Sequence, residues 1–179
     1  MLRNGENRGR ILSMIMGQAQ PGPPIKIGTM DAEWVGDENA DRTLLYLHGG
    51  GYVMDIAAVH WDAVADLCER LGASATVPLY PLAPEHKADE SLEAMRSLYL
   101  EVAGRYGADH VTVMGDSAGG GMTLALAQML KAADQPLPGS LVLYSPWLDA
   151  TATAEGQREI EPRDGMLAVG GLKACGDMY

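Results

Sequence analysis

Predicted strands and helices alternate along most of the chain, and this alternation limits the fold more than any other feature of the sequence. We expect strands at residues 43–47, 74–80, 111–115 and 140–144, with helices between them at 59–71, 89–106 and 118–132. A weaker pattern at residues 25–27 and 32–35 predicts a hairpin before them. Strand and helix in regular alternation build a parallel sheet with helices on its faces. The fold class is therefore α/β.

The predicted strands read as continuous apolar runs. Leu44-Leu45-Tyr46-Leu47 and Val111-Thr112-Val113-Met114 are two examples. Strands of this kind are covered on both faces, as in a parallel sheet between helical layers. In such sheets the functional residues gather beyond the carboxyl ends of the strands. Two glycine-rich segments follow predicted strands at those ends, and both are candidate sites.

The first glycine-rich segment is Gly115-Asp116-Ser117-Ala118-Gly119, between a predicted strand and a predicted helix. A G-x-S-x-G at this kind of turn predicts a nucleophile elbow. The tight turn strains the backbone of the serine, and small flanking residues avoid clashes. A phosphate-binding loop would need G-x-G-x-x-G or a Gly-Lys-Ser/Thr ending, and the segment has neither. Ser117 is therefore the candidate nucleophile.

The second segment is His48-Gly49-Gly50-Gly51-Tyr52, directly after the strand at 43–47. Consecutive glycines allow the backbone N–H groups to turn toward a substrate and approach it closely. Acyl transfer passes through a tetrahedral oxyanion that needs such preorganised donors. By itself the segment could be a flexible turn. Together with an elbow further along the chain, it predicts an oxyanion loop.

Four motifs in order resemble the hormone-sensitive-lipase-like branch of the α/β-hydrolase carboxylesterases, over about residues 34–152. They are the two segments above (the first extended to Gly121), Tyr80-Pro81-Leu82-Ala83-Pro84-Glu85-His86 and Ser145-Pro146-Trp147-Leu148-Asp149. The resemblance implies an α/β-hydrolase fold. It also implies a serine carboxylesterase that hydrolyses short to medium acyl esters through an acyl-enzyme, without a metal or cofactor.

The resemblance also implies roles for individual residues. It makes Ser117 the nucleophile and assigns the oxyanion hole to the N–H groups of Gly50, Gly51 and Ala118. His48 would support the glycine loop through hydrogen bonds.

Three large side chains within these motifs have expected positions. Tyr52 is expected near the mouth of the pocket. Trp147 and Leu148 are expected either to line the pocket or to pack in the interior.

All the histidines precede the candidate nucleophile. They are His48, His60, His86 and His110. A serine nucleophile needs a base to take its proton, and in this fold the partners follow in the order Ser, Asp or Glu, His. We therefore expect the triad histidine to be missing from this chain. Asp149 and Asp164 match structural positions of the family, and neither is assigned as the triad acid.

The four histidines have other expected roles. His48 is the one expected near the pocket. His60, at the start of a helix, is expected to cap that helix or to pack, and His86 lies in a turn with a structural role. His110 precedes the strand that carries Ser117, and a strand of five residues spans roughly 16 Å. His110 is therefore expected at the opposite edge of the sheet.

Family members are longer, so the chain resembles the front part of such an enzyme. We expect an N-terminal cap segment at 1–24, which includes a helical stretch at 8–18, the hydrolase core at 25–150, and the start of a second cap segment at 151–179. The strand at 140–144 would then form an apolar sheet edge, which predicts pairing with a second copy. Two alternatives stay open: a non-catalytic small-molecule binder on the same scaffold, or a fragment without function.

The charge and the cysteine content limit which partners and which cellular compartment are expected. Lys plus Arg is 13 and Asp plus Glu is 24, a net charge of −11, so nucleic acid would be repelled. The two cysteines, Cys68 and Cys175, form neither a disulfide scaffold nor a four-ligand zinc site. A reducing, cytoplasmic compartment fits best. No apolar stretch approaches the length of a membrane span. The expected partner is the small ester that the family resemblance implies.

Overall fold

The computed structural model describes residues 25–27, 30–37 and 39–179 of the chain. In these residues the strands form one sheet in the order β1-β2-β4-β3-β5-β6. The strands are β1 (Ile25–Ile27), β2 (Met30–Gly36), β3 (Thr43–Leu47), β4 (Ser74–Pro78), β5 (Val111–Asp116) and β6 (Ser140–Tyr144). Strands β4, β3, β5 and β6 are parallel, and β2 runs antiparallel to both β1 and β4. The predicted hairpin and parallel sheet are confirmed.

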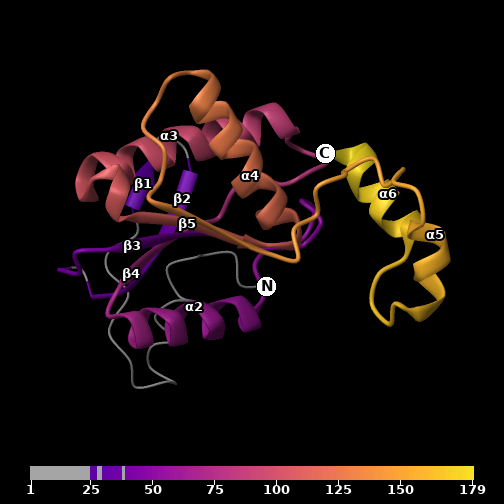
Figure 1. The fold of residues 1–179 in the computed structure, drawn as a ribbon, viewed down its shortest axis with the longest axis horizontal. Helices are drawn as coiled ribbons and strands as arrows, with labels where there is room; N and C mark the ends of the chain where they lie inside the picture. The colour runs from indigo at the N-terminus through magenta and orange to yellow at the C-terminus, as the bar shows by residue number, and fades with distance from the viewer. Residues whose placement is uncertain (1–24, 28–29, 38) are drawn as a thin grey trace.

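Helices cover both faces of this sheet (Figure 1). The helices are α2 (Ala58–Leu71), α3 (Ala88–Tyr106), α4 (Ser117–Ala132), α5 (Gln157–Ile160) and α6 (Val169–Met178), with short 3₁₀ turns η2 (Ala108–His110) and η3 (Glu161–Arg163). Helix α2 lies on one face, and α3 and α4 lie on the other. Helices α5 and α6, in yellow, lie at the end of the sheet where the parallel strands finish. In the described part of the chain, no helix is long and apolar enough to cross a bilayer.

Strand β3 shows why two apolar layers form. All five of its residues are buried, and successive side chains of a strand point to opposite faces. Leu45 and Leu47 join the core under α3 and α4, together with Leu98 and Leu126. Leu44 and Tyr46 join the other core under α2. The continuous apolar run in the sequence thus corresponds to a strand buried on both sides.

The ends of the elements differ slightly from the predicted ones. Strand β4 ends at Pro78 instead of Tyr80, after Pro78 pairs with Ala32 at the last position of the ladder. Strand β5 continues to Asp116, which pairs with Tyr144, and α4 begins at Ser117. The predicted helix at 8–18 and the N-terminal cap segment at 1–24 lie outside the described residues.

The register of the sheet places the two glycine-rich segments together. Leu47, the last residue of β3, pairs with Gly115 on β5. The glycine loop that follows Leu47 therefore leaves the sheet beside the turn that carries Ser117. Their nearness is a consequence of parallel pairing, since both strands finish at the same edge.

Candidate active site

Ser117 lies at the junction of β5 and α4 in a left-handed backbone conformation, with φ of +48°. This region is disfavoured for residues other than glycine, and such strain persists only when the surroundings enforce it. One enforcing contact is the Trp147 N–H, which donates to the Ser117 carbonyl oxygen at 2.8 Å. The turn therefore has the backbone strain that a nucleophile elbow requires.

Two glycines flank Ser117 where no side chain would fit. A Cβ on Gly115 would lie 2.5 Å from the carbonyl oxygens of Gly119 and Leu47. A Cβ on Gly119 would lie 1.9 Å from the Leu47 oxygen. Both clashes are with backbone, which cannot move aside. The glycines of the motif are thus required by close packing of α4 against the end of β3.

The glycine loop after β3 has left-handed backbone at successive positions. The φ angles are +128° at Gly50, +62° at Gly51 and +64° at Tyr52. The Gly50 carbonyl oxygen accepts the Val53 and Met54 N–H groups at 3.2 and 3.0 Å, which closes the loop. Because its own N–H groups need not lie in a ladder, the loop can present them to a ligand beside Ser117.

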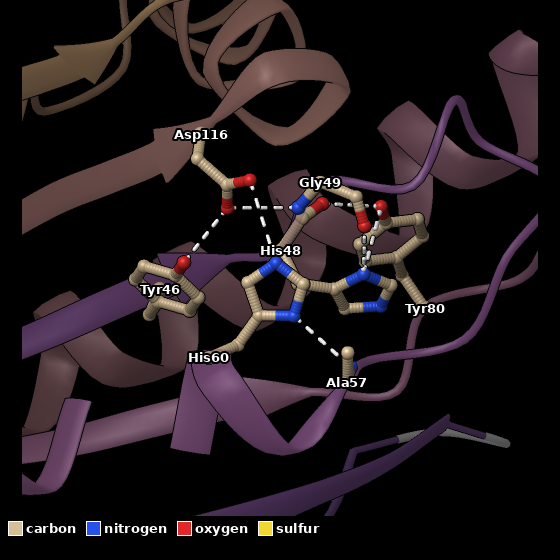
Figure 2. A network of polar contacts seen from close by, with 7 residues as sticks. All are labelled: Tyr46, His48, Gly49, Ala57, His60, Tyr80 and Asp116. Carbon is tan, nitrogen blue, oxygen red and sulfur yellow. Dashed lines mark hydrogen bonds and ion pairs between the residues drawn. The ribbon is translucent and has the colours of Figure 1, made fainter. Parts of the chain in front are cut away.

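Asp116, the residue before Ser117, joins the glycine loop to the turn that carries Ser117 (Figure 2). Its Oδ1 accepts the Tyr46 hydroxyl at 2.7 Å and the Gly49 N–H at 2.8 Å. Its Oδ2 lies 3.4 Å from Nε2 of His60. Burial, and then the hydrogen bond to Asp116, raise the pKa of Tyr46, which keeps its hydroxyl protonated as a donor.

His48 is fully buried and contacts the glycine loop, where the resemblance placed its supporting role. Its Nδ1 lies 2.6 Å from the Gly49 carbonyl oxygen, so Nδ1 carries the proton. The Tyr80 ring stacks on His48 at 4.3 Å, and the Tyr80 hydroxyl donates to the His48 carbonyl oxygen at 2.6 Å. Burial lowers the pKa of His48, so the ring is neutral. Among the described residues its Nε2 has no hydrogen-bond partner.

The remaining histidines lie away from Ser117 or are held by other groups. His86 pairs with Glu90 at 2.9 Å at the exposed start of α3. His110 lies in η2, before β5, and its Nδ1 is 2.9 Å from the Asp41 carbonyl oxygen. His110 is therefore at the far end of the strand from Ser117, as predicted.

His60 is the residue that the sequence reasoning missed. The expected capping role is present, since Nδ1 of His60 accepts the Ala57 N–H at 3.0 Å. The contact with Asp116 was not expected, because no motif joins α2 to the elbow. The one usable signal was position: a histidine in the first turn of a helix that starts near the carboxyl edge of the sheet.

Tyr52 has a buried side chain, and its expected place near the mouth of a pocket stays a prediction. Its ring stacks on Tyr179 at 3.7 Å and on Trp147 at 5.4 Å. Burial raises its pKa to about 12. Leu148 is exposed. The aromatic stack connects the glycine loop to the end of α6.

The two carboxylates of the C-terminal segment stabilise turns. Asp149 accepts the Thr151 hydroxyl and the N–H groups of Thr153 and Ala154, and these hydrogen bonds lower its pKa. Asp164 accepts the N–H groups of Met166 and Leu167. Neither carboxylate contacts a histidine among the described residues, in keeping with their structural assignment. The described residues also contain no cluster of three or more potential metal ligands.

Comparison with known proteins gives a consistent picture. A family profile described as alpha/beta hydrolase fold matches residues 44–179. An esterase of Acinetobacter venetianus is 32% identical over 84% of this chain and 50% of its own length. An acetyl-hydrolase of Streptomyces hygroscopicus is 32% identical over 99% of this chain and 62% of its own length.

A solved structure agrees with these relatives. An esterase of the bacterial hormone-sensitive lipase family superposes with a TM-score of 0.82 at 26% identity, over 100% of this chain and 63% of that one. The chain thus spans about half to two thirds of the length of these three proteins.

Proposed function

The chain belongs to the α/β-hydrolase family, in its hormone-sensitive-lipase-like branch of carboxylic ester hydrolases, and on that premise we propose that it carries the nucleophile and oxyanion loop of a serine carboxylesterase. The observation that carries this proposal is the strained backbone of Ser117, at φ of +48°, beside a loop of left-handed glycines. Strain of this kind is stored where function needs it. A merely structural strand–helix turn has no need of it.

In the proposed reaction the Ser117 oxygen attacks the carbonyl carbon of an ester. The carbonyl π electrons move to oxygen, and the resulting oxyanion rests on the N–H groups of Gly50, Gly51 and Ala118. A base takes the Ser117 proton and passes it to the departing oxygen. When the oxyanion collapses, the alcohol leaves with that proton and the acyl group stays on Ser117. Water then hydrolyses the acyl-enzyme, which returns the serine and releases the acid. No metal or cofactor takes part.

The base that accepts the Ser117 proton lies outside the groups described above. His60 uses Nδ1 for Ala57 and directs Nε2 to Asp116, while Nε2 of His48 is buried without a partner among the described residues. In this fold the acid and the histidine follow the nucleophile. We propose that a complete triad needs residues beyond those of this chain, and that the 179-residue chain hydrolyses esters only slowly.

The proposed substrates are esters with short to medium acyl chains. The family resemblance suggests this range, and one relative is named an acetyl-hydrolase. The further proposals are a cytoplasmic location, a small ester as the ligand, and residues 151–179 as part of a cap. Helix α6 supports the last of these, since its Cys175 lies beside Gly51 of the loop.

A boronic acid tests the nucleophile without requiring turnover. Butaneboronic acid should form a bond between boron and the Ser117 oxygen, with loss of the serine proton to water, giving a tetrahedral anion like the transition state. The measurement is the ¹¹B NMR signal of tetrahedral boron in the presence of the full chain. Ser117→Ala should abolish that signal. An equal signal from the Ser117→Ala variant would overturn the assignment.

The second candidate is a non-catalytic small-molecule binder on the same scaffold. The engagement of His60 with Ala57 and Asp116 favours it, because among the described residues no base is paired with Ser117. The two candidates differ in the fate of a bound ester. If the ester binds to both the wild-type chain and Ser117→Ala, and neither chain speeds its cleavage, the chain is a binder. Faster cleavage by the wild type supports the esterase.

A further inference from the structure

We infer that His60 is a positioning residue of the oxyanion loop: it holds the Asp116 carboxylate in the orientation that binds the Gly49 N–H and thereby directs the Gly50 N–H. The inference rests on the proposed function, because the loop it positions is the proposed oxyanion loop. Figure 2 shows the residues involved, which come from α2, β3, β5 and the glycine loop.

The first step is the location of the proton on His60. His60 is the third residue of α2, and its Nδ1 accepts the Ala57 N–H at 3.0 Å. A neutral imidazole has one donor and one acceptor nitrogen. Because Nδ1 is the acceptor, Nε2 carries the proton, and Nε2 faces Oδ2 of Asp116 at 3.4 Å. The ring is thus fixed by one contact and directs a donor at the carboxylate with the other.

The second step is what this donor does to Asp116. The other oxygen, Oδ1, already accepts Tyr46 and Gly49. A carboxylate held at one oxygen can still rotate, whereas contacts at both oxygens define its plane. The side chains of His60 and Asp116 are only 16% and 24% exposed, so water competes weakly for either oxygen. His60 therefore limits the rotation that would weaken the bond to Gly49.

The third step leads from Gly49 to the proposed oxyanion donors. The Gly49 N–H is bound to Asp116 at 2.8 Å, and its carbonyl oxygen is 2.6 Å from Nδ1 of His48. That carbonyl and the Gly50 N–H belong to one planar peptide group. Fixing Gly49 on both sides therefore fixes the direction of the Gly50 N–H. Close packing adds to this, since a Cβ on Gly49 would lie 2.2 Å from Oδ2 of Asp116.

Two substitutions separate this role from simple helix capping. His60→Gln places an amide nitrogen near the position of Nε2, so it keeps a donor toward Asp116 and loses the acceptor for Ala57. His60→Asn places its oxygen near the position of Nδ1, so it keeps the cap and loses the donor. The positioning role predicts that Gln rescues the loop and Asn does not. A capping role predicts the opposite order.

The readout is hydrogen exchange of the Gly49 amide, measured by NMR on the full chain. His60→Asn should speed exchange at Gly49 about tenfold or more, since exchange reports local opening. His60→Gln should stay close to the wild type. The exposed His86→Asn is the matched control and should leave Gly49 unchanged. Unchanged exchange in His60→Asn, or faster exchange only in His60→Gln, would overturn the inference.

Asp116→Asn gives a second line of evidence if His60→Asn folds poorly. It retains an oxygen for Gly49 and places an NH₂ group against the His60 donor, so Gly49 should again exchange faster. Combining it with His60→Asn should add little, because the contact is already lost. Additive effects, with each substitution speeding exchange by its full factor, would show that the two residues act independently and would overturn the inference.

A catalytic readout links the loop to the reaction. In residual ester hydrolysis, His60→Asn should lower kcat about tenfold to a hundredfold, the range that small misplacements produce. The KM should change little, because the affected donor meets charge that develops in the transition state. If the wild-type chain forms no tetrahedral boronate, the proposed function fails. Hydrogen exchange of the Gly49 amide still decides whether His60 has the positioning role.

Discussion

At the scale of one residue, Gly119 has no room for a side chain, and substitution with alanine tests this close packing. A Cβ there would lie 1.9 Å from the Leu47 oxygen, whereas a Cβ on Gly104, in α3, would meet no atom of another segment within 4 Å. Gly119→Ala should destabilise the fold by about 1–3 kcal/mol or more through overpacking. Gly104→Ala should stabilise it by up to about 1 kcal/mol, as alanine does in helices.

Urea unfolding of both variants measures the difference. Each variant is a glycine-to-alanine change in a helix, so the gain in helix propensity contributes similarly to both unfolding free energies. Equal unfolding free energies for the two variants would contradict the close packing of α4 against the end of β3.

A second prediction concerns the buried His48. Burial lowers its pKa in the folded state, so below about pH 6.5 the unfolded chain takes up the proton more readily. At higher pH the titration of His48 therefore does not change the free energy of unfolding. As the pH falls, it lowers that free energy. His48→Gln should flatten the loss of unfolding free energy between about pH 7 and pH 5.

Urea unfolding across that pH range checks this, with the exposed His86→Gln as the histidine control. A slope in His48→Gln that matches the wild type would show that His48 is not held neutral by burial.

At the scale of elements, α6 packs closely against the segment that follows β6. A Cβ on Gly176 would lie 1.7 Å from the Ala150 oxygen, whereas a Cβ on Gly171 in the same helix would meet no atom of another segment within 4 Å. The end of α6 is also held by the Tyr179 carbonyl oxygen, which accepts the Ala88 N–H at 3.0 Å. We expect Gly176→Ala to displace α6 and Gly171→Ala to leave it in place.

Alkylation of Cys175 reports this displacement, because its thiol lies beside Gly51. Gly176→Ala should raise the alkylation rate several-fold, and the buried Cys68 is an internal reference that should stay slow in every variant. No difference between the two glycine variants would argue against the observed docking.

At the scale of the whole molecule, strand β6 is expected to determine whether the chain self-associates. It pairs with β5 on one side and forms the edge of the sheet among the described strands. Leu141, Val142 and Tyr144 are 38%, 45% and 72% exposed, and an apolar edge of this kind favours pairing with another chain. We expect the 179-residue chain to self-associate despite its net charge of −11.

Light scattering over a concentration series measures this association. Val142→Lys adds a charge at the edge and should weaken it, as edge lysines do in native sheets. A wild-type chain that stays monomeric at high concentration would contradict the prediction.

Activity is also a property of the whole chain. Among the described residues no histidine is paired with Ser117, so hydrolysis of an activated short ester should be limited to the contribution of the proposed oxyanion loop and binding, about 10³–10⁴ over water. A spectrophotometric assay with p-nitrophenyl acetate measures it. Rapid turnover that Ser117→Ala abolishes would require a base within this chain, and His48 would be tested first.

The elements and the two loops could be predicted from the sequence because their signals are short in range. The strand pattern around Leu45 reflects burial on both faces, and Gly115 and Gly119 reflect sterics within one turn. Motif order then implied the family, which the matched relatives confirm. The residues predicted as nucleophile and oxyanion donors remain a prediction, although Ser117 has the expected strained backbone.

Other features were decided by the tertiary structure alone. His60 meets Asp116 because α2 packs beneath the sheet with its first turn at the carboxyl edge, and no spacing in the sequence encodes that approach. Tyr52 is buried because Tyr179, at the far end of the chain, stacks on it. The sequence by itself determined what each segment forms, since local periodicity and glycine placement act over a few residues. Contacts between distant segments depend on how the layers pack, and only the folded chain decides them.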